Sequence, residues 1–197
     1  MFLVTTTIDL LRHGEVEGGA CYRGISDDPL SATGWKQMQH KLPADSPWDL
    51  IISSPLSRCH AFSKSLSQQR QLPLQVNSAF QEIDFGDWEG KTAAQIDPQL
   101  LAQFYLDPVS FPPPNGEHFT HFQERTIKAW QSLYASHPGK HLLLITHAGV
   151  IRNILTHILA LDTQHSFRIK IGHACLSQIQ CFQEPEKEDF LQLIKHG

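Results

Sequence analysis

The sequence predicts an α/β fold in which a mostly parallel sheet is covered by helices on both faces. Short apolar runs alternate along the chain with longer segments whose apolar residues recur at helical spacing. The run from Leu142 to Ile145 is apolar at every position, which is typical of a strand buried on both faces. Strands that alternate with helices in this way usually pair in parallel, because a helix carries the chain back across the sheet.

The elements can be assigned in order from these patterns and their end signals. Apolar runs predict strands at residues 7–11, 49–53, 74–76, 142–145, 167–171, 176–182 and 190–194. Helical spacing predicts helices that begin near residues 31, 54, 92, 119 and 149. Ser31 is the expected cap of the first helix, and Ser54 followed by Pro55 is the expected start of the second. The buried side of that second helix is predicted to carry Leu56, Cys59, Ser63 and Leu66.

Size and composition favour one globular domain over residues 1–197. The chain weighs 22.3 kDa, and its 41% hydrophobic and 18% charged residues suit a folded core better than a disordered polymer. The formal net charge of −4 argues against a nucleic-acid partner, since surfaces that bind nucleic acid carry an excess of basic residues.

The sequence also predicts a cytoplasmic protein with no membrane partner. The first eleven residues have no basic start and are interrupted by threonines, so they are interpreted as a strand and not as a signal peptide. No apolar run approaches the roughly 20 residues that cross a bilayer. The four cysteines are scattered, which favours reduced thiols.

Basic side chains follow three of the predicted strands. Arg12 and His13 end the first strand, Arg58 lies in the first turn of the second helix, and His147 follows the most apolar strand. Ligands of open α/β sheets bind where strands end and helices begin. Guanidinium groups and helix N-termini both suit phosphate oxygens. We therefore expect these four residues to share one anion-binding site.

The two histidines favour turnover over simple binding. A neutral imidazole can accept a phosphoryl group on one nitrogen, while the other nitrogen carries the proton and is held by an acceptor, such as a carbonyl of the loop at Gly14. The two arginines and a protonated His147 would stabilise charge on the phosphoryl oxygens. Glu82, which precedes a glycine-rich loop, is the candidate acid for the leaving oxygen.

These residues lie in motifs that resemble those of the histidine phosphatase superfamily, in its phosphoglycerate mutase-like branch. The segments 11–15 (LRHGE), 27–34 (DDPLSATG), 54–58 (SPLSR) and 145–152 (ITHAGVIR) match its pattern in family order. The resemblance implies a three-layer α/β/α sandwich. It also implies His13 as the phosphohistidine nucleophile, with Arg12, Arg58 and His147 around the phosphate.

Within the superfamily, segments 82–90 (EIDFGDWEG) and 114–117 (PNGE) are most similar to α-ribazole phosphatases of cobalamin nucleotide-loop assembly. This resemblance implies a small phosphate ester as substrate, Glu82 as proton donor and then base, and no metal or other cofactor. Tyr22, Arg23 and Gly24 of the first loop are candidate contacts to the leaving group.

Three other hypotheses are tested against this one. A phosphoglycerate mutase or sugar bisphosphatase would use the same residues, although mutases usually shield the phosphohistidine with insertions that this compact chain lacks. A noncatalytic phosphate sensor would need only the anion site. His118 and His121 form an H-x-x-H pair, but no third ligand stands at a suitable spacing for zinc.

Overall fold

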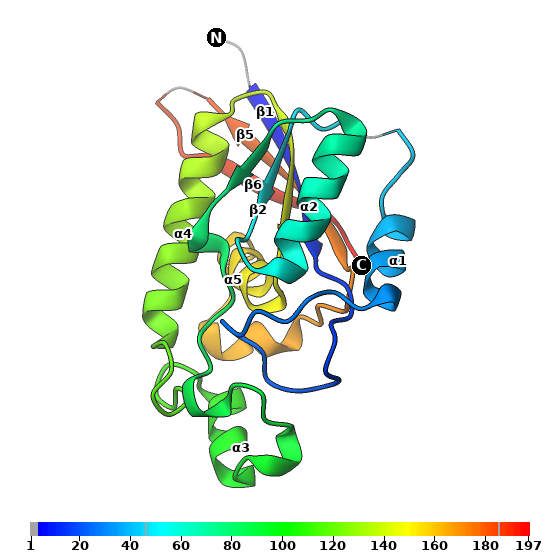
Figure 1. The fold of residues 1–197 in the computed structure, drawn as a ribbon. Coiled ribbons are helices and arrows are strands. Elements are labelled where there is room, and N and C mark those ends of the chain that lie inside the picture. The colour runs from blue at the N-terminus through cyan, green and yellow to red at the C-terminus, as the bar shows by residue number, and fades with distance from the viewer. Residues whose placement is uncertain (1–3, 46, 185) are drawn as a thin grey trace.

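The computed structural model describes residues 4–45, 47–184 and 186–197 and contains a six-stranded sheet with helices on both faces (Figure 1). The strand order is β3-β2-β4-β1-β5-β6. The strands are β1 (Val4–Arg12), β2 (Leu50–Ser53), β3 (Leu74–Val76), β4 (His141–Thr146), β5 (Leu176–Gln183) and β6 (Phe190–His196). The α-helices are α1 (Ala32–Lys41), α2 (Ser57–Arg70), α3 (Pro98–Leu106), α4 (Phe119–Ser136) and α5 (Ala148–Ile158).

The first four strands in this order are parallel, and β5 and β6 extend the sheet in antiparallel fashion. The predicted α/β fold with a mostly parallel sheet is confirmed. In the register of β1 and β4, Arg12 lies beside Thr146, and Ser53 of β2 lies beside Ile145. The carboxyl ends of these three strands therefore meet at one edge, as the sequence predicts.

Alternate residues of the central strands face two separate cores. In β4, Leu142 and Leu144 pack with α4 and α5, whereas Leu143 and Ile145 pack with α1 and α2. This alternation explains why the strand is apolar at every position, since both of its faces are covered. The two cores fix the helices against the sheet and so fix the strand ends between them.

The helix α3 lies away from the sheet, at the end of the molecule where the strands β1, β2 and β4 terminate (Figure 1). A third small core, formed by Trp88, Ile96 and Phe104, holds it. The helix expected from residue 92 to 105 is instead two elements, a short 3₁₀ helix at Ala93–Gln95 and then α3. Asp97 caps α3 and Pro98 occupies its first turn, where a missing N–H costs nothing.

Two further expectations about elements are wrong. Residues 167–171 do not form a strand: residues 163–168 are a 3₁₀ helix, in which the ring of Phe167 packs against that of Tyr105 with centroids 4.9 Å apart. Ser54 does not cap α2, which begins at Ser57 after Leu56. Its hydroxyl instead contacts His147. The other assignments hold, including the cap at Ser31, which accepts a hydrogen bond from the Gly34 amide.

The buried side of α2 is as predicted, with Leu56, Cys59, Ser63 and Leu66 all inaccessible to solvent or nearly so. In the described part of the chain, no helix combines the length and apolar character that a bilayer crossing requires.

Candidate active site

His13 lies directly after β1, and its ring is held in one orientation. Its Nδ1 lies 2.7 Å from the carbonyl oxygen of Gly14, so Nδ1–H donates and Nε2 keeps its lone pair. This confirms the expected carbonyl partner in the Gly14 loop. Burial lowers the pKa of His13 well below its ordinary value, and the positive charges of Arg12 and Arg58 lower it further. The ring is therefore neutral near pH 7, which is the form a nucleophile needs.

The close packing around Gly14 fixes this loop against α1. A Cβ atom at Gly14 would lie 2.2 Å from the carbonyl oxygen of Gly34, and one at Gly34 would lie 2.0 Å from that of Glu15. Only glycine permits so close an approach of two backbones. The nucleophile candidate is thus carried on a rigid support.

Arg12, the last residue of β1, lies next to His13 in the wall of a cavity. One amino group donates to the carbonyl of Ile171 at 2.8 Å. Its Nε is buried and has no hydrogen-bond partner among the described residues. A buried N–H without a partner on a cationic group is suited to an anion oxygen.

His147 and Arg58 lie behind this wall and are both fully buried. The rings of His13 and His147 have centroids 5.3 Å apart. The Nε–H of Arg58 donates to Nδ1 of His147 at 3.3 Å, and Nε2 of His147 lies 2.7 Å from the hydroxyl of Ser54. This pattern requires a neutral His147 with its proton on Nε2.

The pKa of His147 agrees with that assignment. Burial lowers it well below the ordinary value, and the charge of Arg58 adds to the effect. The structure therefore disagrees with the protonated His147 expected from the sequence. The amino groups of Arg58 donate to the carbonyls of Gly24 and Ser26, so this guanidinium supports the loop and the His147 ring and does not line the cavity.

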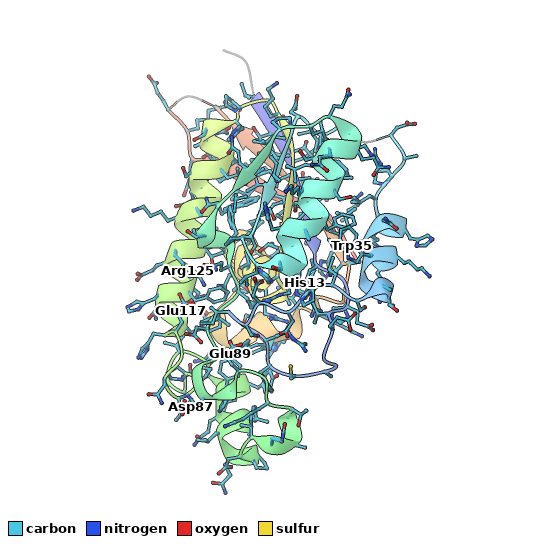
Figure 2. The ribbon with its side chains drawn as sticks, in the orientation of Figure 1. His13, Trp35, Asp87, Glu89, Glu117 and Arg125 are labelled. Atoms are coloured by element: carbon cyan, nitrogen blue, oxygen red, sulfur yellow. The ribbon has the colours of Figure 1, made fainter. Side chains whose placement is uncertain are left out.

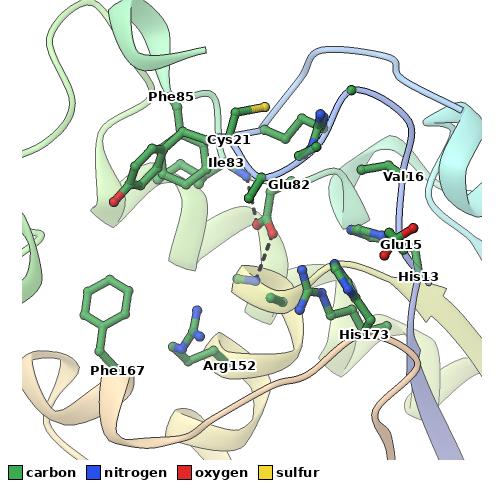
Figure 3. A pocket seen from close by; sticks show the side chains of 18 of the residues that line it. His13, Glu15, Val16, Cys21, Glu82, Ile83, Phe85, Arg152, Phe167 and His173 are labelled. Atoms are coloured by element: carbon green, nitrogen blue, oxygen red, sulfur yellow. Dashed lines mark hydrogen bonds between the residues drawn. The ribbon is translucent and has the colours of Figure 1, made fainter. Parts of the chain in front are cut away.

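Glu82 faces the same cavity as His13 and is held by backbone amides. Its carboxylate accepts from the N–H of Gly149 at 3.0 Å and from that of Ile83 at 3.1 Å (Figure 3). Gly149 belongs to the first turn of α5, whose positive end favours a negative charge. The loop at Glu82 is thus well anchored, with its carboxyl group directed toward the cavity.

A partly buried guanidinium on α4, that of Arg125, anchors the backbone of Glu82 from the other side. Arg125 donates to the carbonyls of Gln81 and Glu82 and pairs with the carboxylate of Glu117 at 2.7 Å (Figure 2). Glu117 lies in the 114–117 motif that the sequence singled out. Its role in the structure is therefore to neutralise Arg125 and to fix the Glu82 turn.

The cavity has a volume of about 720 Å³ and is much larger than a phosphate group. Arg12, His13 and Glu82 line one part of it. The remaining lining includes an aromatic wall beside further polar and small residues; the wall is formed by Phe85, Phe104, Tyr105, Phe119, Phe122 and Phe167. The cavity therefore offers both polar groups and aromatic surface, with room for more than a phosphate group.

The three candidate leaving-group residues have different positions. Tyr22 lines the cavity, and its hydroxyl lies 2.8 Å from that of Tyr105; burial and this contact raise the pKa of Tyr22. Arg23 also lines it, but its guanidinium is paired with Asp28 at 2.7 Å. Gly24 does not line the cavity; its N–H donates to the carboxylate of Glu89.

Sequence reasoning missed three polar residues of the cavity wall, namely Arg152, Asn153 and His173. The ring of His173 lies 6.0 Å from that of His13. Arg152 is the last residue of the 145–152 motif and Asn153 comes directly after it. Their spacing of four residues from Ala148 and Gly149, which places them on the same helical face, is the signal that could have found them. Among the described residues, no group of three His, Cys, Asp or Glu side chains could hold a metal ion.

Comparison with known proteins agrees with the motifs and the geometry. The profile of the histidine phosphatase superfamily (branch 1) matches residues 8–191. The chain belongs to the histidine phosphatase superfamily. It is 28% identical to the adenosylcobalamin/alpha-ribazole phosphatase of Escherichia coli (strain K12), over 89% of this chain and 90% of that protein.

Solved structures show the same relationship. The alpha-ribazole phosphatase from Shigella flexneri superimposes with a TM-score of 0.78 and 27% identity, over 95% of both chains. A mycobacterial glucosyl-3-phosphoglycerate phosphatase superimposes with a TM-score of 0.79 and 26% identity, over 90% of this chain and 91% of that one. The chain is a phosphatase, and its relatives are named for different phosphate esters.

Proposed function

We propose that this histidine phosphatase hydrolyses a small phosphomonoester through a phosphohistidine formed on His13. The observation that carries the proposal is the neutral ring of His13, fixed by the Gly14 carbonyl, in one cavity with Arg12 and the Glu82 carboxyl group. The nucleophile, an anion contact and a candidate acid are thus present at one site.

In the first step, Nε2 of His13 attacks phosphorus as the bond from phosphorus to the leaving oxygen breaks. Protonated Glu82 gives its proton to that oxygen, and the alcohol departs. Arg12 donates to the phosphoryl oxygens, where negative charge accumulates in the loose transition state. Arg58 holds the surrounding loop and the ring of His147, and its positive charge acts from behind the cavity wall.

In the second step, water attacks phosphorus and the P–N bond breaks. The Glu82 carboxylate accepts the proton of the attacking water, so inorganic phosphate leaves and neutral His13 is regenerated. Each turnover consumes one ester and one water and yields one alcohol and one phosphate.

Rapid quenching with ³²P-labelled substrate tests the intermediate. We expect a protein-bound label that is stable in base and labile in acid, and that is absent from His13→Ala. His173→Ala is the matched control, because His173 is the other cavity histidine near His13 and should keep the label. Label retained by His13→Ala would overturn the proposal.

Among small esters, we propose α-ribazole 5′-phosphate as the substrate. This choice is supported by the 82–90 and 114–117 motifs, by the large aromatic cavity and by the named relatives. A phosphate-release panel of α-ribazole 5′-phosphate, phosphoglycerates, sugar bisphosphates and nucleotides tests it. The highest kcat/KM should belong to α-ribazole 5′-phosphate, and a higher value for a sugar bisphosphate would refute the choice.

Two further measurements separate the other hypotheses. Phosphoglycerates should give inorganic phosphate without an isomer if they react at all, whereas isomer formation indicates a mutase. Hydrolysis of p-nitrophenyl phosphate should survive EDTA. No hydrolysis between about pH 5 and 8 would favour a noncatalytic phosphate sensor.

A further inference from the structure

One face of α5 points into the cavity that His13 and Glu82 also line. Ala148, Gly149, Arg152 and Asn153 all line the cavity, and they recur at the spacing of one helical face. The neighbouring residues Val150, Ile151, Ile154 and Leu155 belong to the hydrophobic core. The face begins with Ala148 and Gly149, whose N–H donates to Glu82, and ends one turn later with Arg152 and Asn153.

Asn153 carries a complete amide without hydrogen-bond partners. Its side chain is 2% exposed, and neither Nδ2 nor Oδ1 has a partner among the described residues. Buried amides are nearly always hydrogen-bonded, so both a donor and an acceptor are left for a molecule in the cavity. A carboxylate can only accept and would leave Oδ1 without a partner, whereas a hydroxyl both donates and accepts.

Arg152 adds free donors beside this amide. Its guanidinium lies 5.1 Å from the ring centre of Phe167, and its Nε donates weakly to the carbonyl of Ile169 at 3.4 Å. In the described part of the chain, its two amino groups form no hydrogen bond and no carboxylate lies within 4 Å of them. Figure 3 shows this guanidinium between Phe167 and Glu82, directed into the cavity.

We propose that Arg152 and Asn153 form a subsite that recognises hydroxyl groups of the leaving alcohol, while the aromatic wall receives an apolar ring joined to it. The preferred leaving group is then a sugar that carries a planar ring, as in a nucleoside. This inference rests on the proposed phosphatase function and assigns two specificity-determining residues to it. They contact the alcohol, and the chemistry at phosphorus stays with His13 and Glu82.

The experiment compares adenosine 5′-monophosphate with 2′,3′-dideoxyadenosine 5′-monophosphate, which differ only in the two hydroxyls. The wild-type enzyme should prefer the first by about tenfold in kcat/KM, as expected for one or two hydrogen bonds. Asn153→Leu should lose that preference, mainly through KM, while kcat/KM for p-nitrophenyl phosphate changes less than about threefold. Leucine has a similar volume and no polar atoms, so the fold should tolerate it.

Thr156→Val is the matched control. Thr156 lies on the same helix, is buried and has an unpartnered hydroxyl, but it does not line the cavity. It should keep the preference for the hydroxylated substrate. Arg152→Leu should reduce the preference, as Asn153→Leu does.

The subsite would be overturned if Asn153→Leu lowered kcat/KM equally for both nucleotides and p-nitrophenyl phosphate. It would also be overturned if the wild-type enzyme did not prefer the hydroxylated nucleotide. The subsite would also be overturned if the wild-type enzyme preferred 3-phosphoglycerate to adenosine 5′-monophosphate and Arg152→Leu abolished that preference. The subsite would then bind a carboxylate. Binding of both nucleotides to His13→Ala, measured by calorimetry, gives a readout without turnover. If hydrolysis fails but this variant still prefers the hydroxylated nucleotide, the proposed function is wrong and the subsite stands.

Discussion

The contact between Gly149 and Glu82 allows the position of the carboxyl group to be changed without altering its chemistry. A Cβ atom at residue 149 would lie 2.2 Å from Oε1 of Glu82, whereas ordinary contact begins near 3.4 Å. The carboxyl oxygen must therefore retreat by about 1.2 Å in Gly149→Ala. The Phe122 ring, 3.1 Å away, needs to give only a few tenths of an ångström.

The expected effect on catalysis is large and the effect on folding small. A misplacement of about 1 Å can cost roughly a hundredfold in rate, so kcat for an alkyl phosphate should fall by about that factor. The loss should be much smaller for p-nitrophenyl phosphate, whose leaving group needs little protonation. Alanine within a helix is favoured over glycine by about 0.5–1 kcal/mol, so the melting temperature should not fall.

Steady-state kinetics on both esters and a thermal melt check this prediction. Gly172→Ala is the control, because a Cβ atom there meets nothing within 4 Å. Glu82→Gln should show the same dependence on the leaving group as Gly149→Ala. If Gly149→Ala slows both esters equally, or leaves the alkyl ester unaffected, the carboxyl group of Glu82 is not the proton donor.

Three other outcomes follow from the buried polar groups. Burial lowers the pKa of both His13 and His147, so below about pH 6.5 the unfolded chain binds more protons than the folded one. The free energy of unfolding, measured by urea denaturation, should therefore decrease between pH 7 and 5.5. An unchanged value would contradict the neutral state of the two buried histidines. Trp48→Phe removes a 2.7 Å hydrogen bond to buried Asp9 and should cost about 1.5–3 kcal/mol of unfolding free energy, more than Trp35→Phe does. Burial raises the pKa of Asp9, but its hydrogen bonds, led by the one from His141, lower the pKa overall. The stability that this network contributes should therefore be lost only as the pH falls below about 4. Its loss already at pH 5, measured by chemical denaturation, would contradict this prediction.

The chemistry-bearing residues were predictable because they lie at the ends of buried strands. Arg12 ends β1, and His13 and His147 directly follow β1 and β4, whose apolar runs are unambiguous; the parallel topology brings these strand ends together. Arg58 lies near them as expected, since its Nε–H donates to Nδ1 of His147 at 3.3 Å. Its hydrogen bonds to the carbonyls of Gly24 and Ser26 were not predictable, because they depend on the path of a loop.

The errors have physical causes that act through tertiary contacts. Ser54 has the sequence features of a helix cap, but its hydroxyl forms a hydrogen bond with His147, which follows β4. Phe167 lies in an apolar run typical of a strand, yet its ring is drawn to Phe104 and Tyr105 of α3. Asn153 looked like an ordinary helical residue, because a missing hydrogen bond is visible only once its surroundings are known.

The helix α3 has its own small core, separate from the two that secure the sheet. It supplies Phe104 and Tyr105 to the cavity, whereas the proposed reacting groups come from the sheet edge and the loop at Glu82. Substitutions in α3 should therefore change the cavity wall and leave the position of His13, Arg12 and Glu82 unchanged. Residues 91–114 are therefore the segment to exchange when the choice of leaving group is to be redesigned, because they shape the far wall of the cavity and leave the sheet edge intact.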